Sequence, residues 1–114
     1  MDKVCLVVTT YESEERAASA AKNMVEKGLA ACATFFKVRS IYKWKGKIDD
    51  ATEYLVIYKT LSTKVEQLKS EVLKTHSYEV PELLEIDVDG VGEGYLRWLS
   101  DTLNPSKTGV NTLP

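Results

Sequence analysis

The chain has 114 residues, a length that suits one domain, and 44% of them are apolar while 28% are charged. This composition is that of an ordinary globular protein and excludes a disordered or fibrous chain. The net charge of −2 argues against a nucleic-acid partner. No apolar run approaches the ~18 residues that span a bilayer, so we expect no membrane partner either.

The first third of the chain predicts a strand followed by a helix. Residues 4–9 form a β-branched apolar run that is typical of a strand covered on both faces. Ser13 is a candidate N-cap because two glutamates follow it, and apolar residues then recur at helical spacing as far as Val25. Gly28 is expected to end this helix.

The middle of the chain predicts a long β-hairpin. Residues 30–45 form one extended arm, Gly46 marks a tight turn, and residues 53–60 form a returning strand. Each arm has about a dozen residues, against a usual strand length of ~5–6. By position, the apolar side chains are expected on one face and the lysines on the other: Tyr42, Trp44 and Ile48 against Lys43, Lys45 and Lys47.

The last part of the chain completes a β-α-β-β-α-β order. Thr63 and Glu66 fit a capping box that opens a second helix, whose apolar stripe ends before His76. Residues 83–88 predict the last strand, residues 92–99 a short helix, and residues 104–114 a flexible tail. The sequence therefore predicts one α+β domain over residues 1–103, a ferredoxin-like sandwich with a long central hairpin and a short C-terminal helix.

The length of the hairpin predicts self-association. Two ordinary helices cannot cover two strands of this length, so part of the hairpin must project with the side chains of Tyr42 and Trp44. Two aromatic residues on one face are typical of an interface, and we expect both to contact a second copy of the chain. The alternative is a monomer whose hairpin curls back on its own sheet.

The two cysteines bear on the cellular compartment. Cys5 and Cys32 lie in apolar runs, and two cysteines cannot build a disulfide framework. We therefore expect free, buried thiols in a reducing compartment. The N-terminus has no stretch that resembles a signal peptide, so the expected location is the cytoplasm.

Candidate chemistry is concentrated in residues 76–82, which hold the single histidine and two carboxylates. His76, Glu79 and Glu82 carry nitrogen and oxygen donors that suit Cu(II), Zn(II) or Ni(II), and a neighbouring subunit would complete such a site. The other interpretation is structural, because a histidine at a helix C-terminus is favoured by the helix dipole. The sequence has no catalytic motif and no nucleotide-binding loop, so we expect no enzyme and no organic cofactor.

Several separated motifs resemble those of the CutA-type divalent-cation tolerance proteins, in the expected order over roughly residues 3–103. They are GLAAC at 28–32, SIYKWKGKI at 40–48, Glu53 with Lys59-Thr60, HSYEVPEL at 76–83 and YLRWL at 95–99. The resemblance implies a ferredoxin-like domain that forms a homotrimer through its hairpins, similar to the PII signal-transduction proteins. It also implies a link to divalent metals, notably copper, with His76 and Glu82 at metal-related positions and Glu79 beside them.

One departure from the family bears on the type of metal site. Some relatives place a cysteine at the end of the first strand, where this chain has Thr9 and Thr10. A nitrogen–oxygen site is therefore favoured over a thiolate site for Cu(I). We predict a trimer that responds to metal ions through weak binding of copper or another divalent cation. The alternative is a PII-like regulatory module that binds a small ligand or a partner protein in clefts between subunits.

Overall fold

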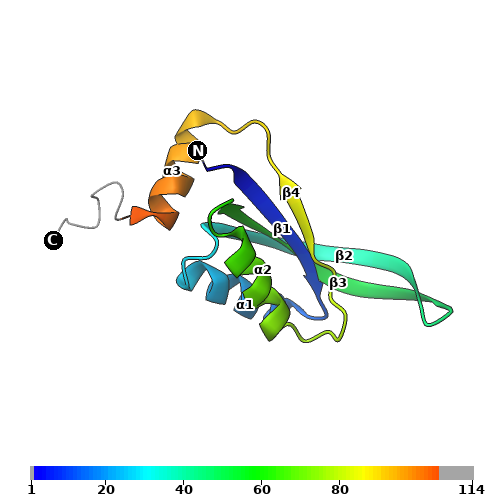
Figure 1. Cartoon of the computed structure of the whole chain (residues 1–114). Helices are drawn as coiled ribbons and strands as arrows, with labels where there is room; N and C mark the ends of the chain where they lie inside the picture. Colours follow the sequence, from blue (N-terminus) through cyan, green and yellow to red (C-terminus); the bar gives the residue numbers. More distant parts are fainter. Residues whose placement is uncertain (1, 106–114) are drawn as a thin grey trace.

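The computed structural model describes residues 2–105, which form four strands and three helices (Figure 1). In chain order they are β1 (Val4–Tyr11), α1 (Glu14–Glu26), β2 (Cys32–Trp44), β3 (Lys47–Leu61), α2 (Val65–Thr75), β4 (Leu84–Asp87) and α3 (Glu93–Leu103). The strands form one antiparallel sheet in the order β2-β3-β1-β4, which confirms the predicted ferredoxin-like α+β fold. The predicted flexible tail lies outside the described residues from residue 106 onward.

Helices α1 and α2 pack on one face of the sheet and form the main core with it (Figure 1). The small side chains of Ala17 and Ala21 let α1 approach the strands closely. The larger buried side chains of this core come from both layers: Val7, Tyr11, Met24, Val56, Tyr58, Leu68 and Val72. Removal of this apolar surface from water, at roughly 25 cal/mol per Å², is the main source of stability.

Helix α3 forms a second, smaller core at the end of the sheet where β1 begins and β3 ends. Leu99 and Leu103 pack there with Val4, Ala31 and Leu61. The helix begins one residue later than predicted and continues to Leu103, four residues past the predicted end. Among the described helices, none has the length and the hydropathy needed to cross a membrane.

The helix boundaries follow the predicted signals at α1 and depart from them at α2. Ser13 caps α1 by accepting a hydrogen bond from the Arg16 backbone N–H at 3.1 Å, and Gly28 follows the helix with a φ of +71°, which favours glycine. The predicted capping box at Thr63 is wrong. A turn after β3 brings Lys64 to the N-cap position of α2, where no side chain caps the helix.

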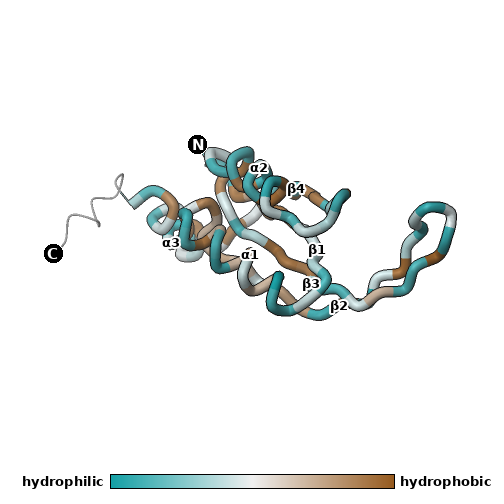
Figure 2. The backbone as a smooth tube through the Cα atoms, turned by 90° about the horizontal axis from the view of Figure 1, so that it is seen from below, coloured by the Kyte–Doolittle hydropathy of each residue, from teal (hydrophilic) through white to brown (hydrophobic). Residues whose placement is uncertain are grey.

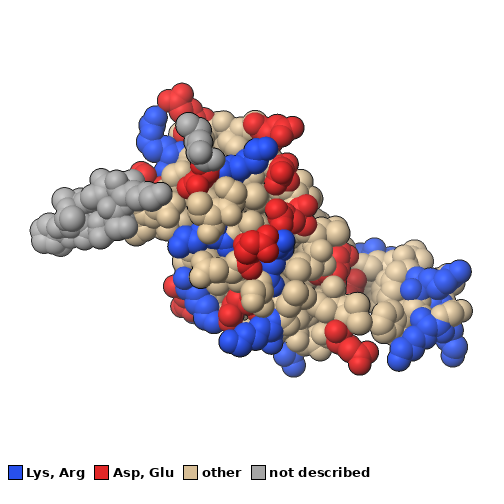
Figure 3. Space-filling model, viewed as in Figure 1, with Lys and Arg blue, Asp and Glu red and all other residues tan. Residues whose placement is uncertain are grey.

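The β2–β3 hairpin projects beyond the rest of the domain (Figure 1). Its arms have 13 and 15 residues, which confirms the predicted length, and the molecule measures 54 Å along its longest axis. Hydrophobic and polar residues alternate along the projecting part (Figure 2), and lysine and arginine side chains gather at its tip (Figure 3). Further back along the hairpin, where Arg39 pairs with Thr52, Arg39 donates two hydrogen bonds to Asp50, at 2.9 and 2.7 Å.

The predicted placement of apolar residues on one face of the hairpin and lysines on the other is wrong for the arm after the turn. The two turn residues have positive φ angles of 50° and 80°, as in a type I′ turn, and this turn pairs Trp44 with Lys47 and Lys43 with Ile48. Cross-strand partners lie on the same face of a sheet, so the turn exchanges odd and even positions between the arms. Ile48 therefore shares a face with Lys43, and Lys47 shares one with Trp44.

The sheet face opposite α1 and α2 is apolar and partly open. The register places Leu84 and Ile86 of β4 on this face, and Phe36 lies on the same face at the opposite edge of the sheet, in β2. Phe36 is 50% exposed, and the two β4 residues are also about half exposed. Strand β4 is one residue shorter at each end than predicted. Phe36, Leu84 and Ile86 are thus among the exposed large hydrophobic residues of the described chain.

Candidate functional site

The predicted site residues lie in the connection between α2 and β4, which passes the end of β1. His76 is the C-cap of α2, and its extended backbone ends the helix. The connection then passes from the helix-covered face of the sheet to the open face, because His76 stacks on Tyr11 while Tyr78 reaches Glu53. The two faces of the sheet thus receive different members of the predicted site.

Both ring nitrogens of His76 make hydrogen bonds. Nδ1 accepts from the Tyr78 backbone N–H at 3.0 Å, so Nε2 carries the ring proton and donates to Thr9 Oγ1 at 3.1 Å. The ring stacks on Tyr11 with centroids 4.3 Å apart and an angle of 8° between the planes. Burial lowers the pKa of His76, which keeps the imidazole neutral at pH 7. His76 therefore fastens the connection to the sheet.

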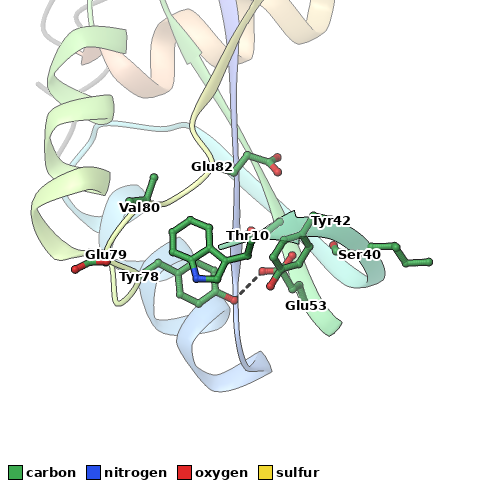
Figure 4. A pocket seen from close by; sticks show the side chains of 10 residues that line it. Thr10, Ser40, Tyr42, Glu53, Tyr78, Glu79, Val80 and Glu82 are labelled. Atoms are coloured by element: carbon green, nitrogen blue, oxygen red, sulfur yellow. Dashed lines mark hydrogen bonds between the residues drawn. The ribbon is translucent and has the colours of Figure 1, made fainter. Parts of the chain in front are cut away.

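A cavity of about 600 Å³ lies on the open face, between the projecting part of the hairpin and residues 78–82 (Figure 4). Alternate residues of β2 point to the same face, so the strand contributes Ser40, Tyr42 and Trp44 to its wall. Tyr42 and Trp44, the predicted interface residues, are 41% and 42% exposed. Three aromatic rings and three carboxylates belong to this lining: Tyr42, Trp44, Tyr78, Glu53, Glu79 and Glu82.

Glu53 is the buried charged residue of this cavity. It is 7% exposed, and its Oε2 accepts a hydrogen bond from the Tyr78 hydroxyl at 2.7 Å (Figure 4). In the described part of the chain, no basic side chain forms an ion pair with Glu53. Burial, and then the hydrogen bond to Glu53, raise the pKa of Tyr78, so the phenol keeps its proton and stays a donor.

Replacing Tyr78 by phenylalanine is expected to lower the free energy of unfolding by about 1.5–3 kcal/mol. The reason is that the buried carboxylate of Glu53 loses the phenol that donates to it. Urea unfolding at pH 7 measures the change, and Tyr95→Phe is the matched control because Tyr95 is exposed on α3. Equal stability of the two variants would contradict the assigned hydrogen bond.

The structure brings Glu79 and Glu82 to the cavity and leaves His76 on the other face of the sheet. Within residues 2–105, one group of three metal-ligating side chains has its ligand atoms within 4.8 Å of one another, and it consists of Cys5, Glu85 and Asp87. His76, Glu79 and Glu82 therefore do not converge on one ion in a single chain. Their role in metal binding stays a prediction.

The cluster at Cys5 lies where β1 pairs with β4. The Cys5 Sγ is 3.8 Å from Asp87 Oδ1, while Glu85 forms an ion pair with Lys69 at 2.6 Å. Burial raises the pKa of the Cys5 thiol, and Asp87 raises it further, so the thiol keeps the proton that a metal would have to displace. The predicted burial is confirmed for Cys5, whereas Cys32 is partly exposed because β2 is an edge strand.

Sequence reasoning named Glu53 as part of a family motif but did not assign it to the site. It opens the apolar run of residues 53–60 and is in phase with Leu55 and Ile57. A carboxylate in phase with an apolar sheet face is unusual, because glutamate is almost never fully buried without a partner. The position of Glu53 on the apolar face of the predicted strand was therefore the sequence signal that it has a partner in the folded protein.

Comparisons with known proteins agree with the fold and the motifs. Residues 5–102 match the family described as CutA1 divalent ion tolerance protein. The chain is 39% identical over 94 residues to the divalent-cation tolerance protein CutA of Pyrococcus horikoshii, which covers 82% of this chain and 92% of that one.

Solved structures of relatives extend the agreement to three dimensions. The structure of CutA from Synechococcus elongatus has a TM-score of 0.87 at 32% identity, over 89% of this chain and 90% of that one. The structure of the periplasmic divalent cation tolerance protein CutA from Archaeoglobus fulgidus has a TM-score of 0.84 at 36% identity, over 88% and 98% of the two chains. The chain therefore belongs to the CutA1 divalent ion tolerance protein family.

Proposed function

We propose that this protein acts in tolerance of divalent cations, as a homotrimer without catalytic activity. The cellular role follows from the family, whose members named above are described as divalent-cation tolerance proteins. A non-catalytic role is supported by the state of the reactive side chains. The His76 imidazole is hydrogen-bonded at both nitrogens, and the Cys5 thiol is buried and protonated.

The observation that carries the assembly part of this proposal is the half-exposed apolar face of the sheet. Phe36, Leu84 and Ile86 lie on it, and Tyr42 and Trp44 continue the same face along the projecting arm. Monomeric proteins rarely expose a large contiguous apolar surface. Three copies related by a closed rotation would bury this face of each chain. The native mass is then expected to be three times the 12.8 kDa of one chain.

Metal binding in this proposal is weak and is directed to copper or another divalent cation. His76, Glu79 and Glu82 supply nitrogen and oxygen donors, which suit Cu(II). The free lone pair of a neutral imidazole is the one that a metal takes, and in His76 the Tyr78 backbone N–H occupies it. A metal ion must displace that hydrogen bond and obtain further ligands from a neighbouring subunit, and both requirements support a low affinity.

Replacing His76 by alanine is expected to weaken Cu(II) binding about tenfold or more, because it removes the only imidazole in the chain. Calorimetric titration of Cu(II) into the metal-free protein at pH 7 measures the affinity. Glu26→Gln, on the exposed end of α1, is the matched control and should bind Cu(II) as the wild type does. Unchanged affinity in His76→Ala would remove His76 from the site.

We place the protein in the cytoplasm. The support is that Cys5 and Cys32 are free thiols, which a reducing compartment preserves. The relative from Archaeoglobus fulgidus is described as periplasmic, so the location of this protein needs its own test. Cell fractionation with an antibody against the chain tests the proposal, and recovery outside the cytoplasmic fraction would contradict it.

Binding of a small ligand in a regulatory role is the second candidate function. The cavity beside the hairpin favours it, since about 600 Å³ is within the usual size of small-molecule sites. A thermal-shift screen with nucleotides, organic cations and divalent metals tests it, because a ligand that binds only the folded protein raises its Tm. If no ligand raises the Tm, the ligand-binding function is contradicted and assembly is the remaining role of the chain.

A further inference from the structure

We propose that an exposed aromatic pair on α3, Tyr95 and Trp98, is the docking surface for the hairpin tip of a second copy of the chain. The hairpin tip consists of residues 43–47. This inference rests on the proposed self-association and adds a contact between two different surfaces of the chain. It does not depend on metal binding or on a ligand in the cavity.

The aromatic pair stands on the outer side of α3. The inner side of this helix packs on the sheet through Leu96, Leu99 and Leu103. Tyr95 and Trp98 are 42% and 45% exposed, and their ring centroids lie 5.4 Å apart. Residues three apart are neighbours on a helix surface, so the two rings form one continuous patch. Large aromatic side chains are enriched at the centres of protein interfaces, and this patch has that composition.

The surroundings of the aromatic pair are acidic. Asp89 precedes α3, Glu93 begins it and Asp101 lies in its last turn. The one basic residue of the helix, Arg97, already forms an ion pair with Glu93 at 3.0 Å. None of the ion pairs of the described residues includes Asp89 or Asp101. Since aromatic faces also attract ammonium groups within about 6 Å, this surface suits a partner that carries lysines.

The hairpin tip has the complementary character. It holds three lysines and no acidic residue, and lysine side chains gather there (Figure 3). None of the ion pairs of the described residues includes Lys43, Lys45 or Lys47. The tip therefore offers three ammonium groups without a carboxylate partner, and α3 offers carboxylates and two aromatic rings.

The tip that fits this surface belongs to another chain. The hairpin projects at one end of the molecule and α3 lies at the other end, along a longest axis of 54 Å (Figure 1). A closed ring of copies joins one patch of each chain to a different patch of the next chain. The hairpin tip and α3 are suited to such a contact, because they lie at opposite ends and carry opposite charges.

The open face of the sheet is continuous with α3. Val4 of β1 has the same phase as Val8, whose partner in β4 is Leu84 of the open face. Leu99 of α3 packs with Val4, so the helix borders that face. A second copy that covers the open face therefore lies beside α3 as well.

Quenching of Trp98 fluorescence by acrylamide tests the docking. Trp44→Phe leaves Trp98 as the only tryptophan and keeps an aromatic ring in the tip. In the assembled protein, the quenching constant is expected to be about twofold lower or more than in the same variant with Phe36→Glu, whose monomeric state native mass spectrometry checks, because the docked tip excludes water from the ring.

A reversal of charge in the tip is expected to remove this protection. Lys47→Glu places a carboxylate against the acidic surface, and like charges in contact repel each other. Its quenching constant should rise to that of the monomer. Lys22→Glu makes the same change of charge on the exposed side of α1 and should keep the protection. Circular dichroism spectra confirm that both variants fold.

A second measurement maps the contact without any substitution. Carbodiimide couples a lysine amine to a carboxylate when the two groups are in contact. Trimers assembled from a mixture of unlabelled and nitrogen-15-labelled chains are expected to give linked peptides that join residues 43–47 to residues 89–101. Peptides that carry both labels identify links between chains.

The outcomes separate this docking from self-association itself. A native mass of one chain for the wild type would contradict both. A trimer would be kept and the docking overturned if Trp98 were quenched as in the monomer, if the links between chains joined other residues, or if protection survived Lys47→Glu. Protection of Trp98 in the monomer would show that its own chain covers the ring and would also overturn the docking.

Discussion

Replacing Phe36 by glutamate is expected to convert the proposed trimer into monomers. Phe36 is 50% exposed in the single chain and lies on the open apolar face, on the edge strand β2, so assembly through this face would bury it. The substitution forfeits about 1.5–3 kcal/mol of burial per subunit and adds a charge whose burial costs several kcal/mol more. Both losses occur in each of the three subunits. The fold of one subunit is kept, because residue 36 is outside the buried core.

Native mass spectrometry and light scattering measure this effect. The wild type should have three times the chain mass, and Phe36→Glu should have the 12.8 kDa of one chain with an unchanged circular dichroism spectrum. The matched control is Val25→Glu, since Val25 is an exposed apolar residue on α1, away from the open face. A trimer that survives Phe36→Glu would show that the open face is not the interface.

Alkaline pH is expected to unfold this protein steeply. Burial raises the pKa of Tyr11, Tyr58 and Tyr78 above the ordinary value of 10.0. Above pH 10 the unfolded chain therefore releases protons that the folded chain still holds. The stability is fully present below pH 10, and it falls by about 1.4 kcal/mol per pH unit for each of these tyrosines as the pH rises further.

Urea unfolding between pH 9 and 12, at one fixed protein concentration, measures this slope. In Tyr58→Phe the contribution of this phenol is gone, so the slope should become shallower by about 1.4 kcal/mol per pH unit. At pH 7 the same variant should lose little stability, because the Tyr58 hydroxyl has no hydrogen-bond partner among the described residues. A slope equal to that of the wild type would contradict the assignment to Tyr58.

The order of the elements was predictable because each has a local cause. The β-branched run of β1, the N-cap at Ser13 and the alternation along the arms all act within a few residues. The faces of the hairpin were not predictable by counting along the chain, because the turn type decides which residue pairs with which. Lys43 and Ile48 became neighbours through the turn, although the count placed them apart.

The candidate site was predictable in part for the same reason. The cluster of polar groups at residues 76–82 is visible in the sequence, and two of its members, Glu79 and Glu82, line the cavity. That His76 lies on the other face depends on its contacts with Tyr11 and Thr9, more than 60 residues earlier in the chain. Glu53 joins the site only through tertiary contact with Tyr78.

The sheet order has a consequence for how the protein is made. β1 leaves the ribosome first, yet it lies in the middle of the sheet and pairs with β3 and with β4, as in the pairing of Cys5 with Asp87 82 residues later. Contacts so distant in sequence form slowly, and a hydrophobic strand that waits for its partners is prone to aggregate. β1 therefore stays unpaired until β3 has been made, and one of its edges stays open until β4 follows.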